Sequence, residues 1–153
     1  MALNIASGNR YVIVNTKSQT VMDLSGADSV SVIGWSRHGA ENQQWEITFA
    51  GNGWHIKNVA TGKYLRHEGG NQNGSRLIAD QEPFVWHIWP DTHEITAGRI
   101  VVPSSSLNVD LADKGNLAPG TPIQIWGRWD GKNQVWHFDR GRPYPGSLIA
   151  ISI

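Results

Sequence analysis

The chain has 153 residues, a length that fits one domain with its own core, and we expect residues 1–153 to form a single domain. Its 13 basic and 13 acidic side chains give a net charge of zero, which argues against nucleic acid or an anionic membrane as the partner. The sequence contains no Cys, so disulfides, thiolate nucleophiles and Cys-based zinc sites are all excluded. It contains eight Trp, an excess that requires places in a core or on a binding surface.

The N-terminal segment lacks the features of a targeting sequence. Residues 1–10 contain neither a basic region followed by an apolar one nor an amphipathic basic stretch. Apolar runs in the sequence fall well short of the roughly 20 residues that a bilayer-spanning helix needs. We therefore expect a cytoplasmic protein that does not insert directly into a bilayer.

The sequence repeats itself. Residues 13–24 align without a gap with residues 100–111, and both segments end in Asp-Leu. Residues 56–66 have the same pattern, with Arg66 at the Asp position. The three marker positions lie 43 and 44 residues apart. Self-similarity at such a fixed period indicates a fold built from repeated units.

Each repeat closes on a similar phrase that ends in Trp, at Trp45, Trp86 and Trp136. A Trp that recurs at the same place in every repeat is typical of packing, so we expect these three to be scaffold residues. Three repeats of about 43 residues fill most of the chain, over approximately residues 10–50, 51–93 and 94–138.

Short β-strands dominate each repeat. Alternating runs such as 11–14, 54–57 and 123–126 are bounded by Gly, Asn, Asp, Ser or Pro, and we find no helical spacing over ten or more residues. Turn residues recur about every ten positions, which predicts four strands per repeat. Three such units close against one another around a pseudo-threefold axis, which also removes open sheet edges. The sequence therefore predicts an all-β fold, a β-trefoil. We expect residues 139–153 to form a strand that closes the barrel; the alternative is a strand that pairs across a subunit interface.

The closing phrase Gln-x-Trp, at residues 43–45 and 134–136, is the hallmark of the ricin B-type lectin domain. The sequence resembles that family over about residues 10–138, and the loop 35–45 is especially similar to mushroom fruiting-body members. The resemblance implies a β-trefoil that recognises galactose or N-acetylgalactosamine. It also implies dimerisation, seen in several mushroom members, and a defensive role against animals that eat the fungus.

A shallow sugar pocket needs three kinds of side chain. A carboxylate accepts hydrogen bonds from two hydroxyls, an amide both donates and accepts, and an aromatic face covers the C–H patch of the ring. The first repeat carries all three, as Asp23, Trp35 and Asn42, at the positions where the family builds its sites. The resemblance adds His38 and Gly39 to the lining of this carbohydrate-binding site.

The sequence also predicts one supporting residue in the first repeat and the loss of the sugar site in the second. We expect Gln43 to hold Asp23 or the loop rather than to touch sugar. The second repeat has Arg66 at the Asp position, Asp80 at the Trp35 position and Pro83-Phe84 at the Asn42-Gln43 position. We therefore expect it to carry no sugar site.

The third repeat carries a second candidate site. Asp110, Trp126 and Asn133 match the three key residues of the first repeat. Trp129-Asp130 replaces His38-Gly39, and a Trp at that place either fills the pocket or offers a second stacking surface.

Other function classes find little support in the sequence. It contains no G-x-S-x-G, H-E-x-x-H or P-loop motif, and its six His show no metal-site spacing. We expect no enzyme activity, no cofactor and no metal. The rival function is a protease inhibitor, since β-trefoils also display loops that plug protease clefts; Asn71 to Gln81 and Pro143 to Ser147 are the candidate loops.

The expected partners are the glycans of glycoproteins or glycolipids. A shallow site of this kind is weak alone, so useful avidity needs at least two sites on one particle. With one complete site per chain, the sequence predicts a homodimer.

Overall fold

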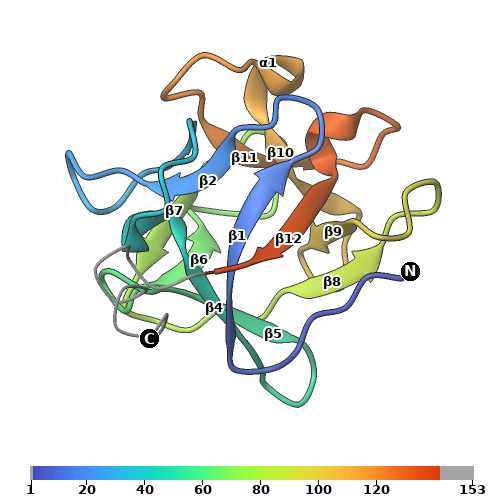
Figure 1. Ribbon diagram of the computed structural model, residues 1–153. Coiled ribbons are helices and arrows are strands. Elements are labelled where there is room, and N and C mark those ends of the chain that lie inside the picture. The colour runs from blue at the N-terminus through green and yellow to red at the C-terminus, as the bar shows by residue number, and fades with distance from the viewer. Residues whose placement is uncertain (1, 142–153) are drawn as a thin grey trace, which may run out of the picture.

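The structure is a computed structural model that describes residues 2–141. It is all-β, and its twelve strands form one continuous sheet system (Figure 1). The strands are β1 (Asn9–Asn15), β2 (Val21–Leu24), β3 (Val32–Trp35), β4 (Trp45–Phe49), β5 (Trp54–Asn58), β6 (Tyr64–His67), β7 (Leu77–Asp80), β8 (His87–Pro90), β9 (Gly98–Val101), β10 (Leu107–Leu111), β11 (Ile123–Gly127) and β12 (Trp136–Arg140). Short helical turns occupy three loops, as η1 (Glu41–Gln43), α1 (Ala112–Gly115) and η2 (Lys132–Gln134).

Six strands form a closed barrel. β1 pairs with β12 and β4, β4 pairs with β5, and β9 pairs with β8 and β12. A bridge between Trp54 and Trp86 joins β5 to the start of β8 and completes the ring. Figure 1 shows β1 and β12 side by side, where the first and last strands meet. Closure satisfies the backbone donors and acceptors that an open edge would expose.

The other six strands form three hairpins, β2–β3, β6–β7 and β10–β11. The bridges Ser31–Ile78, Ile33–Pro122 and Arg76–Gln124 join each hairpin to the other two. Four strands therefore come from each repeat, two for the barrel and two for a hairpin. This arrangement confirms the predicted β-trefoil with pseudo-threefold symmetry.

The strand that closes the barrel is β12, which begins at Trp136 inside the third repeat and not at residue 139. Its register places Arg140 opposite Tyr11, and the Gly141 N–H donates to the Arg10 carbonyl at 2.7 Å. The remainder of the predicted closing strand, residues 142–153, lies outside the described residues.

Three tryptophans anchor the core. Trp45, Trp86 and Trp136 are 0–1% exposed, and each indole N–H donates to a backbone carbonyl, of Met22, Leu65 and Val109 respectively, at 2.8–3.0 Å. A buried indole is stable only if its N–H finds an acceptor, and the same strand position supplies one in every repeat. The predicted scaffold role of these three residues is confirmed.

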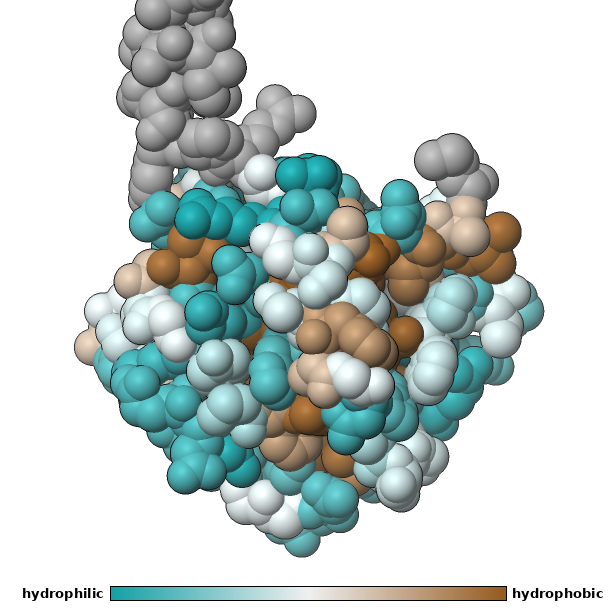
Figure 2. Space-filling model, turned by 90° about the horizontal axis from the view of Figure 1, so that it is seen from below, coloured by the Kyte–Doolittle hydropathy of each residue, from teal (hydrophilic) through white to brown (hydrophobic). Residues whose placement is uncertain are grey.

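Outside the core, large apolar side chains are exposed only singly or in small groups. Phe49, Trp89, Ile95 and Leu117 are examples from the described part of the chain. Figure 2 shows the face seen from below, where brown hydrophobic patches are separated by hydrophilic side chains. Among the described residues, helices are too short to cross a membrane.

Candidate functional site

Four predicted side chains line one pocket on the first repeat, which we call the first-repeat pocket. Asp23 comes from β2, Trp35 from the end of β3, His38 from the following loop and Asn42 from η1. The pocket has a volume of about 340 Å³, and Ser25, Gly26, Ala27 and Ile33 complete its lining. The fifth predicted residue, Gly39, does not line the pocket; its φ of +83° shapes the loop beside it, a conformation that glycine adopts without strain.

Gln43 holds the carboxylate of Asp23 in place. Its amide nitrogen donates to Asp23 Oδ2 at 2.9 Å and to the Ser36 carbonyl at 2.8 Å. Its amide oxygen accepts the His38 N–H at 2.9 Å. One buried amide thus fixes the carboxylate and two positions of the loop after β3, as the sequence predicted for Gln43.

Burial raises the pKa of Asp23, while hydrogen bonding from Gln43, the charge of His38 and hydrogen bonding from Asn42 act in the opposite direction. The carboxylate is 4% exposed and lies at the floor of the pocket. A desolvated carboxylate of this kind is a strong acceptor for ligand hydroxyls, because water competes for it poorly.

His38 presents a donor toward Asp23. Its Nδ1 accepts the Ala40 N–H at 3.1 Å, so the neutral ring carries its proton on Nε2. Nε2 lies 3.9 Å from Asp23 Oδ2, at the edge of the pocket. The loop geometry therefore selects the tautomer that points an N–H at the space a ligand would occupy.

Asn42 is held from both sides. Its side-chain nitrogen donates to the backbone carbonyl of Leu24 at 3.2 Å, and its backbone carbonyl accepts from Asn58 Nδ2 at 3.0 Å. Its second N–H is directed to Asp23, so the amide oxygen is the group it keeps for a ligand. Trp35, 40% exposed, provides the aromatic wall.

Asn58 and its counterpart Asn15 are supporting residues that the sequence analysis does not identify. Asn15 Nδ2 donates to the Asn133 carbonyl at 3.0 Å, just as Asn58 does to Asn42. Each supports a loop of the preceding repeat around the barrel. The equivalent position in the third repeat is Val102. It would support the loop of the second repeat, which has no sugar site. An Asn recurring at one repeat position was the signal available in the sequence.

The second repeat lacks the chemistry of the first. Strand register makes Arg66 equivalent to Asp23 and Asp80 equivalent to Trp35, because Arg66 pairs with Ile78 and Tyr64 with Asp80. The Arg66 guanidinium lies over the ring of Phe84, 5.6 Å from its centroid. The carboxylate and the exposed indole are both replaced, in line with the predicted loss of a site.

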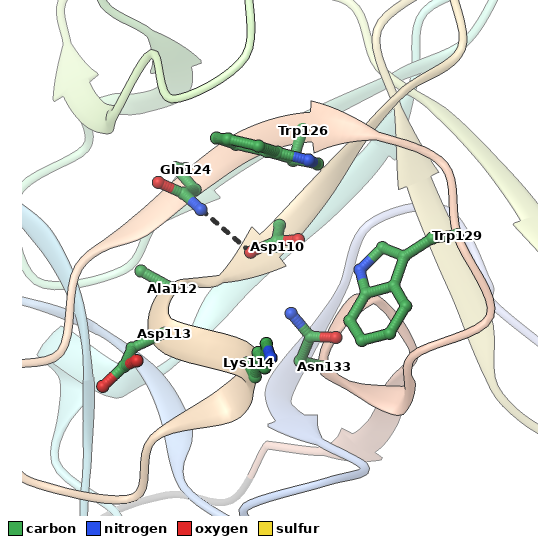
Figure 3. A pocket seen from close by; sticks show the side chains of 8 residues that line it. All are labelled: Asp110, Ala112, Asp113, Lys114, Gln124, Trp126, Trp129 and Asn133. Carbon is green, nitrogen blue, oxygen red and sulfur yellow. Dashed lines mark hydrogen bonds between the residues drawn. The ribbon is translucent and has the colours of Figure 1, made fainter.

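The third repeat forms a larger pocket, the third-repeat pocket, of about 470 Å³. Figure 3 shows its eight lining side chains, with Asp110 and Asn133 at the floor and Trp126 and Trp129 on two sides. Asp110, Trp126 and Asn133 are thus brought together as their counterparts are in the first repeat. Trp129 forms a wall and leaves the pocket open, so it does not fill the site.

Two amides hold the carboxylate of Asp110. Gln134 Nε2 donates to Oδ2 at 2.9 Å, and Gln124 Nε2 donates to Oδ1 at 3.1 Å, the bond dashed in Figure 3. In the first repeat the position of Gln124 is Ile33, which has no donor to give. Burial raises the pKa of Asp110 as well, against the hydrogen bonds from Gln134 and Gln124. The two pockets therefore share a plan and differ in how much of the carboxylate is already engaged.

Comparison with known proteins gives the family. The sequence matches the family described as ricin-type beta-trefoil lectin domain-like over residues 3–80 and, overlapping, over residues 41–126. The chain belongs to this lectin family. The resemblance inferred from the Gln-x-Trp phrases is confirmed, and the family makes the chain a carbohydrate-binding lectin.

Solved structures agree with the family. The lectin is similar to the Macrolepiota procera ricin B-like lectin in complex with lactose, at 44% identity and a TM-score of 0.89, over 90% of this chain and 99% of that one. It shares its fold with the Rhizoctonia solani agglutinin (23% identity, TM-score 0.80, 91% and 99% covered). The designed 3-fold symmetric protein ThreeFoil also shares the fold (22%, 0.77, 85% and 97%). A search of curated proteins gave no match.

Proposed function

We propose that this lectin binds terminal galactose or N-acetylgalactosamine of glycans through the first-repeat pocket, without catalysing a reaction. The observation that carries the proposal is the grouping of a buried carboxylate, an exposed indole and a tethered amide, from Asp23, Trp35 and Asn42, in one pocket. The similar Macrolepiota procera lectin was solved with lactose, a disaccharide that ends in galactose, and this supports the choice of sugar.

Each group has a defined task in this proposal. Asp23 accepts hydrogen bonds from two adjacent sugar hydroxyls, and the amide oxygen of Asn42 accepts from a hydroxyl beside them. The Trp35 ring covers the apolar C–H face of the sugar, a contact that requires no polar group to be desolvated. His38 Nε2–H adds a donor at the pocket edge. A shallow site of this size should bind a monosaccharide with a Kd of roughly 0.1–1 mM.

Weak sites become useful in pairs. The third-repeat pocket provides a second sugar site on the same chain in this proposal, and a homodimer would double the number of sites on each particle. Cytoplasmic storage and defence against animals that feed on the producing organism complete the proposed biology. The partners are glycoproteins or glycolipids of those animals.

The rival inhibitor function gains no support from the loops. Residues 77–80 of the candidate loop are strand β7, and residues 73–75 are tied to β11 through the Asn73 side chain, the Gly74 N–H and the Ser75 carbonyl. The loop is thus held against the neighbouring hairpin rather than extended toward a protease cleft. The second candidate loop, Pro143 to Ser147, lies outside the described residues.

A glycan-array screen of the wild-type protein tests the proposal. We expect signals on glycans with terminal galactose or N-acetylgalactosamine, abolished by free galactose at millimolar concentration. Signals confined to other sugars, or signals that free galactose leaves unchanged, would contradict it.

A further inference from the structure

A buried ion pair lies beneath the third-repeat pocket. Arg99 Nε donates to Asp91 Oδ1 at 2.9 Å, and the two residues are 3% and 5% exposed. Asp91 Oδ2 accepts the N–H groups of His93 and Glu94. Burying two charges costs desolvation free energy, and apolar replacements of such pairs are often as stable or more so. The pair therefore calls for a reason other than stability.

The fold itself accepts apolar residues at these places. Strand register makes Val12 the counterpart of Arg99 in the first repeat, where it packs in a small buried cluster with Val14 and Val21. Counting from the closing Trp makes Ala50 the counterpart of Asp91. Asp91 ends the second repeat and Arg99 begins the third, so the charged pair lies at the junction of these two repeats, where Ala50 and His55 stand at the junction before it.

The remaining donors of Arg99 reach the residues that shape the third-repeat pocket. Nη1 donates to Gln134 Oε1 at 3.1 Å and to Asn108 Oδ1 at 3.2 Å, and Nη2 donates to the Trp129 carbonyl at 3.1 Å. Gln134 Oε1 also accepts the Trp129 N–H at 3.1 Å. Trp129 is therefore bound through both its N–H and its carbonyl, whereas the backbone of its counterpart His38 makes, within residues 2–141, only the N–H contact to Gln43.

Gly131 makes room for the indole ring. A Cβ at this position would lie 2.1 Å from Trp129 Cζ2 and 2.4 Å from Cη2, closer than any real contact. It would also lie 2.5 Å from Asn133 Oδ1. The backbone of Gly131, at φ −64° and ψ 137°, is one that any residue adopts, so these two side chains and not the backbone require glycine. The first repeat, with the smaller His38, has Ala40 at the same place.

We infer that Arg99 and Gly131 position Trp129 as a second apolar wall of the third-repeat pocket, which thereby selects galactose-type sugars that carry an apolar aryl or acyl substituent. The inference rests on the proposed function, because it assumes that Trp126 covers the sugar ring. Gln124 already donates a hydrogen bond to Asp110 Oδ1. The counterpart of Gln124 in the first repeat is Ile33, which leaves the equivalent oxygen of Asp23 free of such a bond, so the carboxylate contributes less to hydroxyl recognition in the third-repeat pocket. The exposed Trp129 ring contributes apolar contact instead.

Two single-pocket proteins test the inference. Asp23→Ala leaves the third-repeat pocket, and Asp110→Ala leaves the first-repeat pocket. Each is titrated calorimetrically with methyl β-galactoside and p-nitrophenyl β-galactoside. We expect the Asp23→Ala protein to prefer the aryl sugar about fivefold, since one added ring contact is available, and the Asp110→Ala protein to show a preference of less than about twofold.

Gly131→Ala in the Asp23→Ala protein displaces the ring and crowds Asn133 Oδ1 without touching the ion pair. We expect it to abolish the aryl preference, which is a ratio of two affinities and does not change when Asn133 weakens both equally. Ala40→Gly in the Asp110→Ala protein is the matched control and should change nothing. The double change Arg99→Val with Asp91→Ala installs the apolar residues that stand at the single equivalent positions Val12 and Ala50, and it leaves no buried charge unpaired. It should shift the Trp129 indole NMR resonance and remove the preference, while the same change in the Asp110→Ala protein leaves first-pocket affinity unaltered.

Equal preference for the aryl sugar in both single-pocket proteins would overturn the inference, as would a preference that survives Gly131→Ala. A loss of affinity in both pockets after the Arg99 change would assign the pair a purely structural role and also overturn it. If the wild-type protein binds neither galactoside, the proposed function itself fails, an outcome distinct from these.

Discussion

Gln43 and Gln134 make the same contacts at equivalent positions of two repeats. Each amide nitrogen donates to a buried carboxylate, and each amide oxygen accepts the N–H of a residue that lines the pocket, His38 or Trp129. The Gln of the Gln-x-Trp phrase is therefore a positioning residue, and the Trp is its anchor in the core. This short motif places a pocket because its two residues point to opposite sides of the chain segment: the Gln side chain faces the site and the Trp side chain faces the core.

The raised pKa of Asp23 predicts a pH limit for sugar binding. Burial is the main cause of the shift, and the ionised carboxylate is the form that accepts hydroxyls. As the pH falls, affinity for methyl β-galactoside should therefore be lost above pH 3.8, the ordinary value for Asp. Calorimetric titration across pH 3–7 measures this.

The same shift has the opposite consequence for folding. Because the pKa is higher in the folded protein than in the unfolded chain, the folded state takes up this proton first, and acid does not destabilise the fold through Asp23. Circular dichroism at each pH should show a folded protein where binding has already been lost. A midpoint for the loss of galactoside affinity at or below pH 3.8 would contradict the prediction.

Exposed and buried tryptophans predict opposite phenotypes. Trp35→Ala should lower galactoside affinity about tenfold and leave the free energy of unfolding within about 1 kcal/mol of wild type, because the ring is partly exposed and lines the pocket. Trp86→Phe changes a residue of the second repeat, which carries no sugar site. It strands the buried Leu65 carbonyl and should cost about 2–3 kcal/mol in urea unfolding with affinity unchanged. A reversal of the two phenotypes would show that the roles are misassigned.

At the scale of elements, each pocket is assembled from one hairpin and the loop that follows it. Both come from one repeat, which is why the sequence predicts Asp23, Trp35 and Asn42 as neighbours, with His38 added by the family resemblance. Contacts between repeats are invisible to such an alignment. Asn58 escapes it because its target, the Asn42 carbonyl, belongs to the repeat before it. Gly39 is a different case: the resemblance adds it to the site, and in the structure it lies in the loop beside the pocket, with a φ of +83°.

The boundary of a loop was also hard to predict. Asn71 to Gln81 is rich in Asn, Gln and Gly at its start, and it contains too few alternating residues to show that β7 begins at Leu77. Its partner strand β6 fixes the register, from Tyr64 opposite Asp80 to His67 opposite Leu77. That information is long-range, as is the tie from Asn73 to Gly127.

Support across the repeat boundary predicts a selective effect. Asn58→Ala removes the donor that holds the Asn42 carbonyl, and it should weaken galactoside binding in the Asp110→Ala protein about tenfold. Asn15→Ala, its counterpart beneath Asn133, should leave that same protein's affinity unchanged. Titration calorimetry of the pair checks this, and equal losses would show that the two residues act only on overall stability.

At the scale of the whole molecule, a neutral protein is matched to a neutral ligand. The 13 basic and 13 acidic residues balance, and the proposed sugars carry no charge. Affinity for a galactoside should therefore change by less than about twofold between low and high salt, roughly 0.05 and 0.5 M NaCl. A steep loss of affinity with salt, measured by calorimetry, would point to an anionic ligand instead.

The threefold plan also lets the chain keep one scaffold while its sites diverge. All three repeats retain the buried Trp and its carbonyl partner, yet the first-repeat pocket has the carboxylate, indole and histidine, the second repeat has lost them, and the third has a second indole. Packing positions are constrained by the shared core, whereas each pocket depends on its own hairpin. Sites can thus be lost or altered singly without loss of the fold.

Retention on immobilised galactose tests the central claim most directly. Asp23→Ala should remove most of the retention and leave only the weaker contribution of the third-repeat pocket, while the thermal midpoint stays within a few degrees of wild type, because Gln43 keeps its bond to the Ser36 carbonyl. Asp110→Ala should reduce retention much less. Full retention of the Asp23→Ala protein, or a greater loss in Asp110→Ala than in Asp23→Ala, would contradict the account.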